Sequence, residues 1–108
     1  MKVEDYIKEG GIFERVAKKR GWYLNPDKEL VRSFAEGLLE NKKRYGMAIC
    51  PCRLATGKKE IDRKIVCPCT YAEDDIKEYG KCYCGLYLSK DGEIEDKAIP
   101  DRHFEYYL

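Results

Sequence analysis

The spacing of apolar residues in the first 46 residues predicts helices. Val3 to Lys8 forms one short amphipathic stretch, and Gly10-Gly11 interrupts it. The following stretch, residues 12–20, repeats apolar residues three and four positions apart and is followed by Gly21. This spacing is typical of a helix with one buried face, and a glycine is a common helix stop. We therefore expect a short helix and then a longer one.

The strongest helical pattern begins after Asn25, a candidate N-cap, and Pro26, which fits the first helical position. One face of this stretch carries an apolar stripe made of Leu30, Val31, Phe34, Ala35, Leu38 and Leu39. Three basic residues stand in the last turn, where the helix dipole favours cations, and Gly46 follows as the stop. This is the best-supported helix of the chain.

After Gly46 the pattern predicts only short elements. Residues 58–64 and 72–79 each carry one small apolar face and lie between cysteine pairs. Helices this short are marginal alone, so we expect them to fold around the cysteines. The apolar run 85–88 then leads into a turn over Ser89-Lys90-Asp91-Gly92.

The C-terminal stretch DRHFEYYL carries three aromatic residues, which we expect to pack back on the body or on a partner. Tyr23, Phe34 and Tyr45 are assigned to the core. A chain of 108 residues has the length of one domain, here 1–108. The sequence thus predicts a small, mostly α domain, with a helical N-terminal half and a cysteine-rich C-terminal half wrapped around a metal group.

Composition excludes some classes of function. The 21 Lys and Arg residues balance 20 Asp and Glu residues, and the net charge of +1 carries no nucleic-acid signature. No window approaches the roughly 18 apolar residues of a membrane span, and the start MKVEDYIKEG lacks a signal-peptide pattern. We expect a soluble cytoplasmic protein with neither a nucleic-acid nor a membrane partner.

All six cysteines fall in three Cys-x-Cys pairs. The pairs are Cys50-Pro51-Cys52, Cys67-Pro68-Cys69 and Cys82-Tyr83-Cys84. Cysteines in a reducing cytosol point to metal or redox chemistry before structural disulfides. Proline disfavours the helical region for the residue before it, so the first two pairs should be extended or turn-like. In an extended stretch, residues two apart share a face, roughly 6.5–7 Å from each other.

Three kinds of chemistry compete for six cysteines. Zinc knuckles usually use Cys-x2-4-Cys spacing, and one zinc would leave two thiols unexplained. Disulfides within a pair close no useful loop, while bridges between pairs stay open. The third division gives four thiolates to a [4Fe–4S] cluster and two to a dithiol that cycles to a disulfide. The spacing alone does not assign a role to any one cysteine.

The order CPC, CPC, CxC resembles the catalytic β subunit of ferredoxin–thioredoxin reductase, whose motif reads CPC, CPC, CHC. The stretches GWYLNPD, FAEGLLENKKRYGMAICPCR and KCYCGLYLSKDGEI resemble the same family, so the similarity covers about Phe13 to Ile94. Tyr83 stands where the family has a histidine, and tyrosine is a poor proton shuttle near neutral pH. The only histidine, His103, is expected to be a solvated tail residue. The middle pair also comes two residues earlier than usual, and the last pair several residues later.

The resemblance implies a role for each cysteine. It implies that a [4Fe–4S] cluster is held by Cys50, Cys67, Cys69 and Cys82. It further implies a redox disulfide between Cys52, the exposed sulfur that attacks a partner, and Cys84, the cluster-side sulfur. Arg53 either favours the Cys52 thiolate or is a surface arginine with a carboxylate partner. Tyr83 could donate a hydrogen bond to a sulfur or to the cluster.

The implied function is an iron–sulfur disulfide reductase, an oxidoreductase that passes single electrons from a ferredoxin-like donor to a thioredoxin-like protein. The alternatives are an iron–sulfur electron-transfer or redox-sensing module and a structural zinc domain. Plant and cyanobacterial enzymes pair this subunit with a second chain, and the sequence leaves open whether one is present. The composition favours a setting without photosynthesis.

The same composition predicts a thermophilic source. Gln is absent, Asn occurs only at Asn25 and Asn41, and Lys and Glu are abundant. Few thermolabile amides and many ion-pairing residues are typical of hyperthermophiles. We therefore expect a melting temperature above the roughly 45–65 °C of mesophilic domains. A calorimetric midpoint inside that interval would contradict a thermophilic source.

Overall fold

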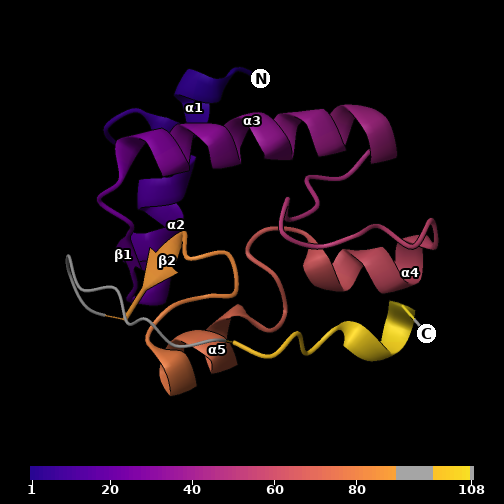
Figure 1. The fold of residues 1–108 in the computed structure, drawn as a ribbon. Coiled ribbons are helices and arrows are strands. Elements are labelled where there is room, and N and C mark those ends of the chain that lie inside the picture. Colours follow the sequence, from indigo (N-terminus) through magenta and orange to yellow (C-terminus); the bar gives the residue numbers. More distant parts are fainter. Residues whose placement is uncertain (90–98, 108) are drawn as a thin grey trace.

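The chain folds into short helices and one small β ribbon, as a computed structural model describes it for residues 1–89 and 99–107 (Figure 1). The helices are α1 (Val3–Ile7), α2 (Ile12–Arg20), α3 (Lys28–Tyr45), α4 (Lys59–Asp62) and α5 (Ala72–Tyr79), with 3-10 turns η1 (Arg63–Ile65) and η2 (Phe104–Tyr107). The antiparallel strands are β1 (Tyr23–Leu24) and β2 (Tyr87–Leu88). The mostly α class is confirmed, and the single domain over 1–108 stays a prediction. The turn expected after Ser89 lies outside the described residues.

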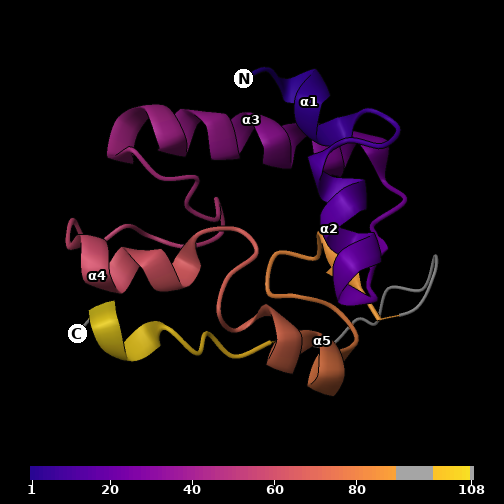
Figure 2. The same cartoon turned by 180° about the vertical axis from the view of Figure 1, so that it is seen from behind.

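The two halves of the chain lie on opposite sides of the molecule. Figures 1 and 2 show α3 along one edge and α5 at the other, with α2 and the β ribbon between them. The C-terminal turn η2 lies beside α4 in both views, and its Tyr106 hydroxyl is 3.0 Å from Lys64 Nζ. None of the described helices is long and apolar enough to cross a membrane.

The N-terminal helices follow the apolar pattern closely. The predicted break at Gly10-Gly11 separates α1 from α2, and Gly21 ends α2 in the left-handed conformation, with φ 75°. Gly46 ends α3 in the same way, with φ 78°. Glycine has no Cβ, so this conformation carries little strain there. The predicted stops are confirmed.

The predicted start of α3 was wrong by two residues. Asp27, not Asn25, is the N-cap, and its carboxylate accepts from the backbone N–H groups of Glu29 and Leu30 at 3.1 and 3.2 Å. The Asn25 side chain is used elsewhere, because its amide donates to the Gly85 carbonyl at 2.7 Å. Asn25 therefore ties the start of α3 to the loop after the last cysteine pair.

The two short helices of the second half are confirmed, but the β ribbon was not predicted. Residues 58–64 contain α4 and most of η1, and 72–79 is α5. Tyr23 pairs with Leu88 and Leu24 with Tyr87. Two residues per strand are too few to show an alternating pattern, so only the fold brings these segments together.

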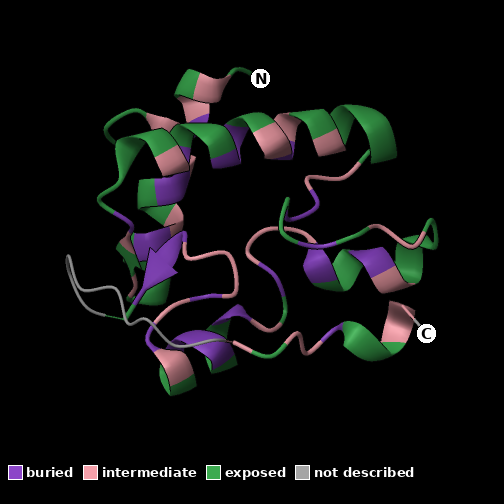
Figure 3. Ribbon diagram, viewed as in Figure 1, coloured by how far each residue is buried: buried purple, intermediate pink, exposed green. Residues whose placement is uncertain are grey.

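An aromatic cluster fills the core between the halves. The Phe13 ring lies 6.1 Å from Phe34 and 6.5 Å from Tyr87, in edge-on geometry. Figure 3 shows the buried positions of α3 on the side toward α2 and the cysteine-rich half. Phe34 is buried as expected, but the core assignment was wrong for Tyr23 and Tyr45, which are 45% and 37% exposed. Tyr23 lies on an edge of the two-stranded ribbon, and Tyr45 ends α3 beside the Arg44 guanidinium.

The first cysteine pair packs directly on α3. Gly37 faces Pro51 so closely that a Cβ at position 37 would lie 2.6 Å from Pro51 Cγ. One helical turn later, the Asn41 amide donates to the Ile49 carbonyl at 2.7 Å. These contacts fix the backbone just before and within Cys50-Pro51-Cys52. Helix α3 thus positions the first cysteine pair.

We predict that Gly37→Ala destabilises the protein by about 1–3 kcal/mol, because the proline ring cannot move away without shifting the cysteines beside it. In an uncrowded helix the same change would stabilise by about 0.5–1 kcal/mol. Chemical denaturation measures the difference, with Glu36→Ala on the exposed face of α3 as the control. An unchanged or higher stability of Gly37→Ala would contradict the close contact.

Candidate active site

A short antiparallel contact brings the first two cysteine pairs together. Ile49 and Val66 form an isolated β-bridge. Next to it, the Cys50 N–H donates to the Ile65 carbonyl at 2.8 Å, and the Cys67 N–H donates to the Ala48 carbonyl at 3.1 Å. Cys50 and Cys67 each follow a residue of this bridge, so the two Cys-Pro-Cys turns begin side by side.

The third cysteine pair occupies a tight turn that β2 anchors to the core. The Cys82 N–H donates to the Tyr87 carbonyl at 3.0 Å, and the Gly85 N–H donates to the Cys82 carbonyl at 2.8 Å. Gly85 has a φ of 76°, which the turn requires and which side chains rarely adopt. The Tyr87 N–H also points at the Cys82 sulfur, at 3.4 Å. Pairing of β2 with β1 holds this turn against the aromatic cluster.

Five of the six cysteines line one small cavity at the centre of these turns. Its lining consists of Cys50, Cys67, Cys69, Cys82 and Cys84 together with Pro68, Tyr83, Phe34, Ala72, Leu86 and Tyr87. The sixth cysteine, Cys52, is not part of the lining and is exposed. The fold therefore separates one outer thiol from five inner sulfurs.

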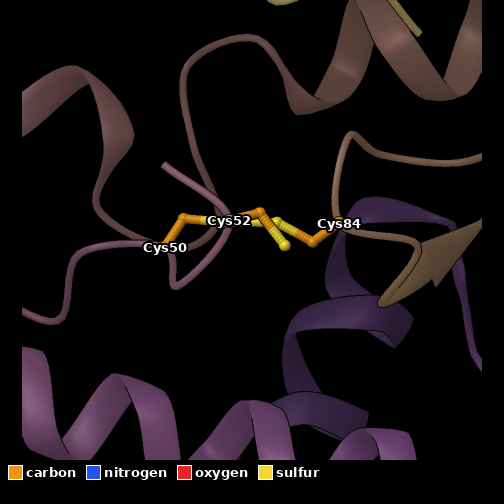
Figure 4. A group of neighbouring side chains, drawn as sticks. All are labelled: Cys50, Cys52 and Cys84. Atoms are coloured by element: carbon orange, nitrogen blue, oxygen red, sulfur yellow. A yellow bond between two sulfur atoms is a disulfide. The ribbon is translucent and has the colours of Figure 1, made fainter. Parts of the chain in front are cut away.

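Three of the sulfurs form a compact group. Figure 4 shows Cys50, Cys52 and Cys84 together, with their Sγ atoms within 4.8 Å of one another. In this structure a disulfide joins Cys50 to Cys84, and Cys52 is free. The predicted disulfide joins Cys84 to Cys52 instead. The structure thus brings the predicted partners together but places the bond on the neighbouring cysteine, and the roles of the six cysteines stay predictions.

The buried thiols are poor thiolates on their own. Burial raises the pKa of Cys67 and of Cys82, and the neighbouring sulfurs raise the pKa of Cys67 further. Burial also raises the pKa of Cys69, although the Arg53 guanidinium acts in the opposite direction. Metal ligation requires thiolates, and a bound metal supplies the positive charge that stabilises them. A metal group inside the cavity would thus make ligands of thiols that otherwise stay protonated.

The described sulfurs do not form a preassembled tetrahedral zinc site. Zinc–sulfur bonds of about 2.3 Å in a tetrahedron require four sulfurs about 3.8 Å apart. In residues 1–89 and 99–107, the only group of metal-ligating side chains this compact has three sulfurs, and two of them are bonded to each other. The four cysteines predicted as ligands, Cys50, Cys67, Cys69 and Cys82, instead line one small cavity.

Arg53 is buried beside this group, not on the surface. It is 4% exposed and pairs with the carboxylates of Asp75, at 3.9 Å, and Asp101. Its guanidinium carbon lies 4.3 Å from the ring centroid of Tyr83 and 5.2 Å from that of Tyr71. The sequence also allowed a surface arginine with a carboxylate partner. The carboxylate partners are confirmed, and the surface location was wrong. Tyr83 thus serves as a stacking face for a cation.

The C-terminal residues pack back on the body, as expected. Arg102 donates to Asp75 and Glu78 of α5, both at 2.6 Å. His103 is fully buried, and its Nδ1 lies 2.8 Å from the Tyr71 hydroxyl. The prediction of a solvated histidine was therefore wrong. The aromatic residues around it shield the ring, and its burial, followed by the Arg53 charge, lowers its pKa.

Several residues of this network had no signal in the sequence. Asp75 and Asp101 lie in ordinary charged stretches, and Tyr71 follows the middle cysteine pair without a recognisable pattern. Each contacts Arg53, and Asp75 and Tyr71 also contact Arg102 and His103, respectively, of the C-terminal segment. A local pattern cannot report such long-range pairs.

We predict that Arg53→Met destabilises the protein by about 3 kcal/mol or more, because it removes one of the two cations beside the buried Asp75 carboxylate and the partner of Asp101. The control is Arg44→Met, since Arg44 forms a solvent-exposed pair with Glu40 and such pairs contribute little to stability. Urea denaturation of both variants measures the contrast. Equal losses for the two variants would contradict a structural role for the buried pair.

Known proteins resemble this chain in sequence. The model of the family described as ferredoxin thioredoxin reductase catalytic beta chain matches residues 4–104. The ferredoxin-thioredoxin reductase catalytic chain of Porphyra purpurea is 35% identical over 83 residues, which cover 75% of this chain and 67% of that one. The catalytic chain of Guillardia theta is 33% identical over 83 residues, covering 75% and 78%.

A chloroplastic catalytic chain shows the same level of similarity. The chain from Arabidopsis thaliana is 33% identical over 86 residues, which cover 78% of this chain and 56% of that longer protein. The matched segment of the family model includes all six cysteines and reaches into the C-terminal residues that pack on Arg53. This chain therefore belongs to the catalytic β-chain family of ferredoxin–thioredoxin reductase, a family of oxidoreductases.

Proposed function

We propose that this protein takes single electrons from a ferredoxin-like donor and uses them to reduce the disulfide of a thioredoxin-like protein. The family membership supports this proposal, and the observation that carries it is that one cysteine is exposed while the other five line a cavity. Five cysteines surround one cavity, and the sixth, Cys52, is exposed within 4.8 Å of two of them. A reductase of this kind needs both an interior electron site and an outer thiol that a partner can reach.

The proposed ligands of a [4Fe–4S] cluster are Cys50, Cys67, Cys69 and Cys82. All four line the cavity. Burial raises the pKa of Cys67, Cys69 and Cys82, so a bound metal group would have to supply the positive charge that stabilises their thiolates. When bound, the cluster would supply electrons one at a time beside the disulfide. In the first alternative, an electron-transfer or redox-sensing module, the Cys52–Cys84 pair would be regulatory. The second, a structural zinc domain, leaves the exposed thiol beside Cys84 without a use.

The proposed redox pair is Cys52 and Cys84. The Cys52 thiolate attacks the disulfide of the partner, forms a mixed disulfide and releases one partner thiolate. The Cys84 thiolate then attacks the Cys52 sulfur, which releases the second partner thiolate and leaves a Cys52–Cys84 disulfide. Two one-electron deliveries from the donor restore the dithiol. Only Cys52 is exposed, so it is the sulfur that a protein partner can contact.

The Cys50–Cys84 bond of the structure is one exchange step away from the proposed pair. Attack of the Cys52 thiolate on the Cys84 sulfur forms the Cys52–Cys84 bond and releases the Cys50 thiolate. The three Sγ atoms already lie within 4.8 Å of one another, so the attacking and leaving sulfurs are close to the sulfur they exchange. The same exchange makes Cys50 available as a metal ligand.

Arg53 supports this chemistry through its fixed position. Desolvation raises the pKa of Cys52, and the Arg53 guanidinium opposes that shift. Because the arginine is held by Asp75 and Asp101, its charge stays close to the thiol. The cytoplasmic location and the thermophilic source stay predictions, and the identity of the donor and the presence of a second subunit stay open.

We predict that Cys52→Ser abolishes reduction of a thioredoxin disulfide while the protein, purified without oxygen, keeps about four irons and four sulfides and a broad brown band. Cys50→Ser should instead lose iron, because it removes a proposed ligand. Activity, iron, sulfide and zinc are measured on the wild type and on both variants.

Three outcomes would contradict the proposal. Unchanged turnover of Cys52→Ser would reject its role as the attacking sulfur. Full iron content in Cys50→Ser would reject the ligand assignment. One zinc and no colour in the wild type, after cluster reconstitution, would make this a structural zinc domain.

A further inference from the structure

The turn that carries Cys52 is supported by the C-terminal segment, here residues 99–107. The Arg53 N–H donates to the Cys50 carbonyl at 3.0 Å, which closes the turn around Cys52. The next N–H, of Leu54, donates to the hydroxyl of Tyr107 at 3.0 Å. The Arg53 side chain pairs with Asp101 of the same segment. Both residues after Cys52 are therefore held by one stretch of chain.

The C-terminal segment is itself anchored to the body. Arg102 pairs with Asp75 and Glu78 of α5, and His103 contacts the Tyr71 hydroxyl. The rings of Tyr106 and Tyr107 pack on His103, with centroids at 4.7 and 5.3 Å. The Tyr107 hydroxyl thus projects from a fixed support and not from a free tail.

Tyr107 lies outside the segment that matches the family model. The match ends at residue 104, three residues before Tyr107. The part of the C-terminal segment that contacts Leu54 therefore follows the matched residues. Family membership alone gives no reason to expect a hydrogen bond at this position.

We propose that Tyr107 is a positioning residue, whose hydroxyl holds the Cys52 turn through the Leu54 N–H and so keeps the Cys52 sulfur within reach of Cys84. The inference rests on the proposed redox pair of Cys52 and Cys84. A disulfide is stabilised by the effective concentration of one thiol near the other. A looser turn lowers that concentration, so the disulfide becomes easier to reduce.

The experiment is a redox titration of the anaerobic holoprotein in mixtures of reduced and oxidised dithiothreitol. The protein disulfide and one dithiothreitol give the protein dithiol and one oxidised dithiothreitol, a two-electron exchange. In Tyr107→Phe the ring still packs on His103, but the hydroxyl is gone. We expect its disulfide to be three- to tenfold less stable than that of the wild type, which raises the midpoint potential by about 14–30 mV.

The matched control is Tyr106→Phe, one residue earlier. The Tyr106 hydroxyl contacts Lys64 Nζ at 3.0 Å and not the Cys52 turn. Tyr106→Phe also removes a tyrosine hydroxyl from the C-terminal segment, and we expect the disulfide of this variant to keep the wild-type midpoint potential. A general loosening of the C-terminal segment would move both variants together.

Peptide mapping of the oxidised wild type separates the possible failures. A wild type without a Cys52–Cys84 disulfide rejects the proposed redox pair, and the positioning role with it. If the wild type forms that disulfide but the midpoint potential of Tyr107→Phe does not shift, the positioning role alone is overturned. An equal shift of the potential in Tyr106→Phe overturns it as well. A shift confined to Tyr107→Phe supports it.

Discussion

Burial of the Arg53 guanidinium is the constraint on which the arrangement of the second half depends. A buried charge without partners is strongly destabilising, so any fold that buries Arg53 must bring carboxylates to it. Asp75 arrives from α5 and Asp101 from the C-terminal segment, while Tyr83 supplies an aromatic face. One side chain thereby connects the first cysteine pair, the last pair, a helix and the end of the chain. His103 is buried because the segment that carries it must reach Arg53.

The thiol cavity adds a second constraint with the same physical origin. Apolar surroundings disfavour free thiolates, and burial raises the pKa of Cys67, Cys69 and Cys82. The short helices α4 and α5, which flank these cysteines, are marginal by themselves. Metal binding by residues that are not preassembled in the unfolded chain contributes directly to folding. A bound metal group would therefore stabilise the same part of the molecule as the Arg53 network.

Local patterns predicted the helices well and the long-range contacts poorly. Apolar periodicity gave the extents of α2 and α5, and the stops at Gly21 and Gly46, because those features depend on neighbours in sequence. The start of α3 failed since two capping residues, Asn25 and Asp27, stand close together, and the fold uses one of them to hold the Gly85 loop. The β ribbon and the buried histidine depend on contacts between distant segments, which no local window contains.

The cysteine spacing left three kinds of chemistry open and did not determine the pairing. Cys50 and Cys52 stand two residues apart in one turn, and the sulfurs of both lie within 4.8 Å of Cys84. Each can therefore form a bond to Cys84, and spacing cannot choose between them. Which of the two cysteines pairs with Cys84 depends on whether Cys50 is a metal ligand, because one sulfur cannot be a thiolate ligand and a disulfide partner at the same time. If Cys50 is a metal ligand, only Cys52 of the first pair is left to form a disulfide with Cys84. If Cys50 is not a ligand, Cys50 and Cys52 compete for Cys84.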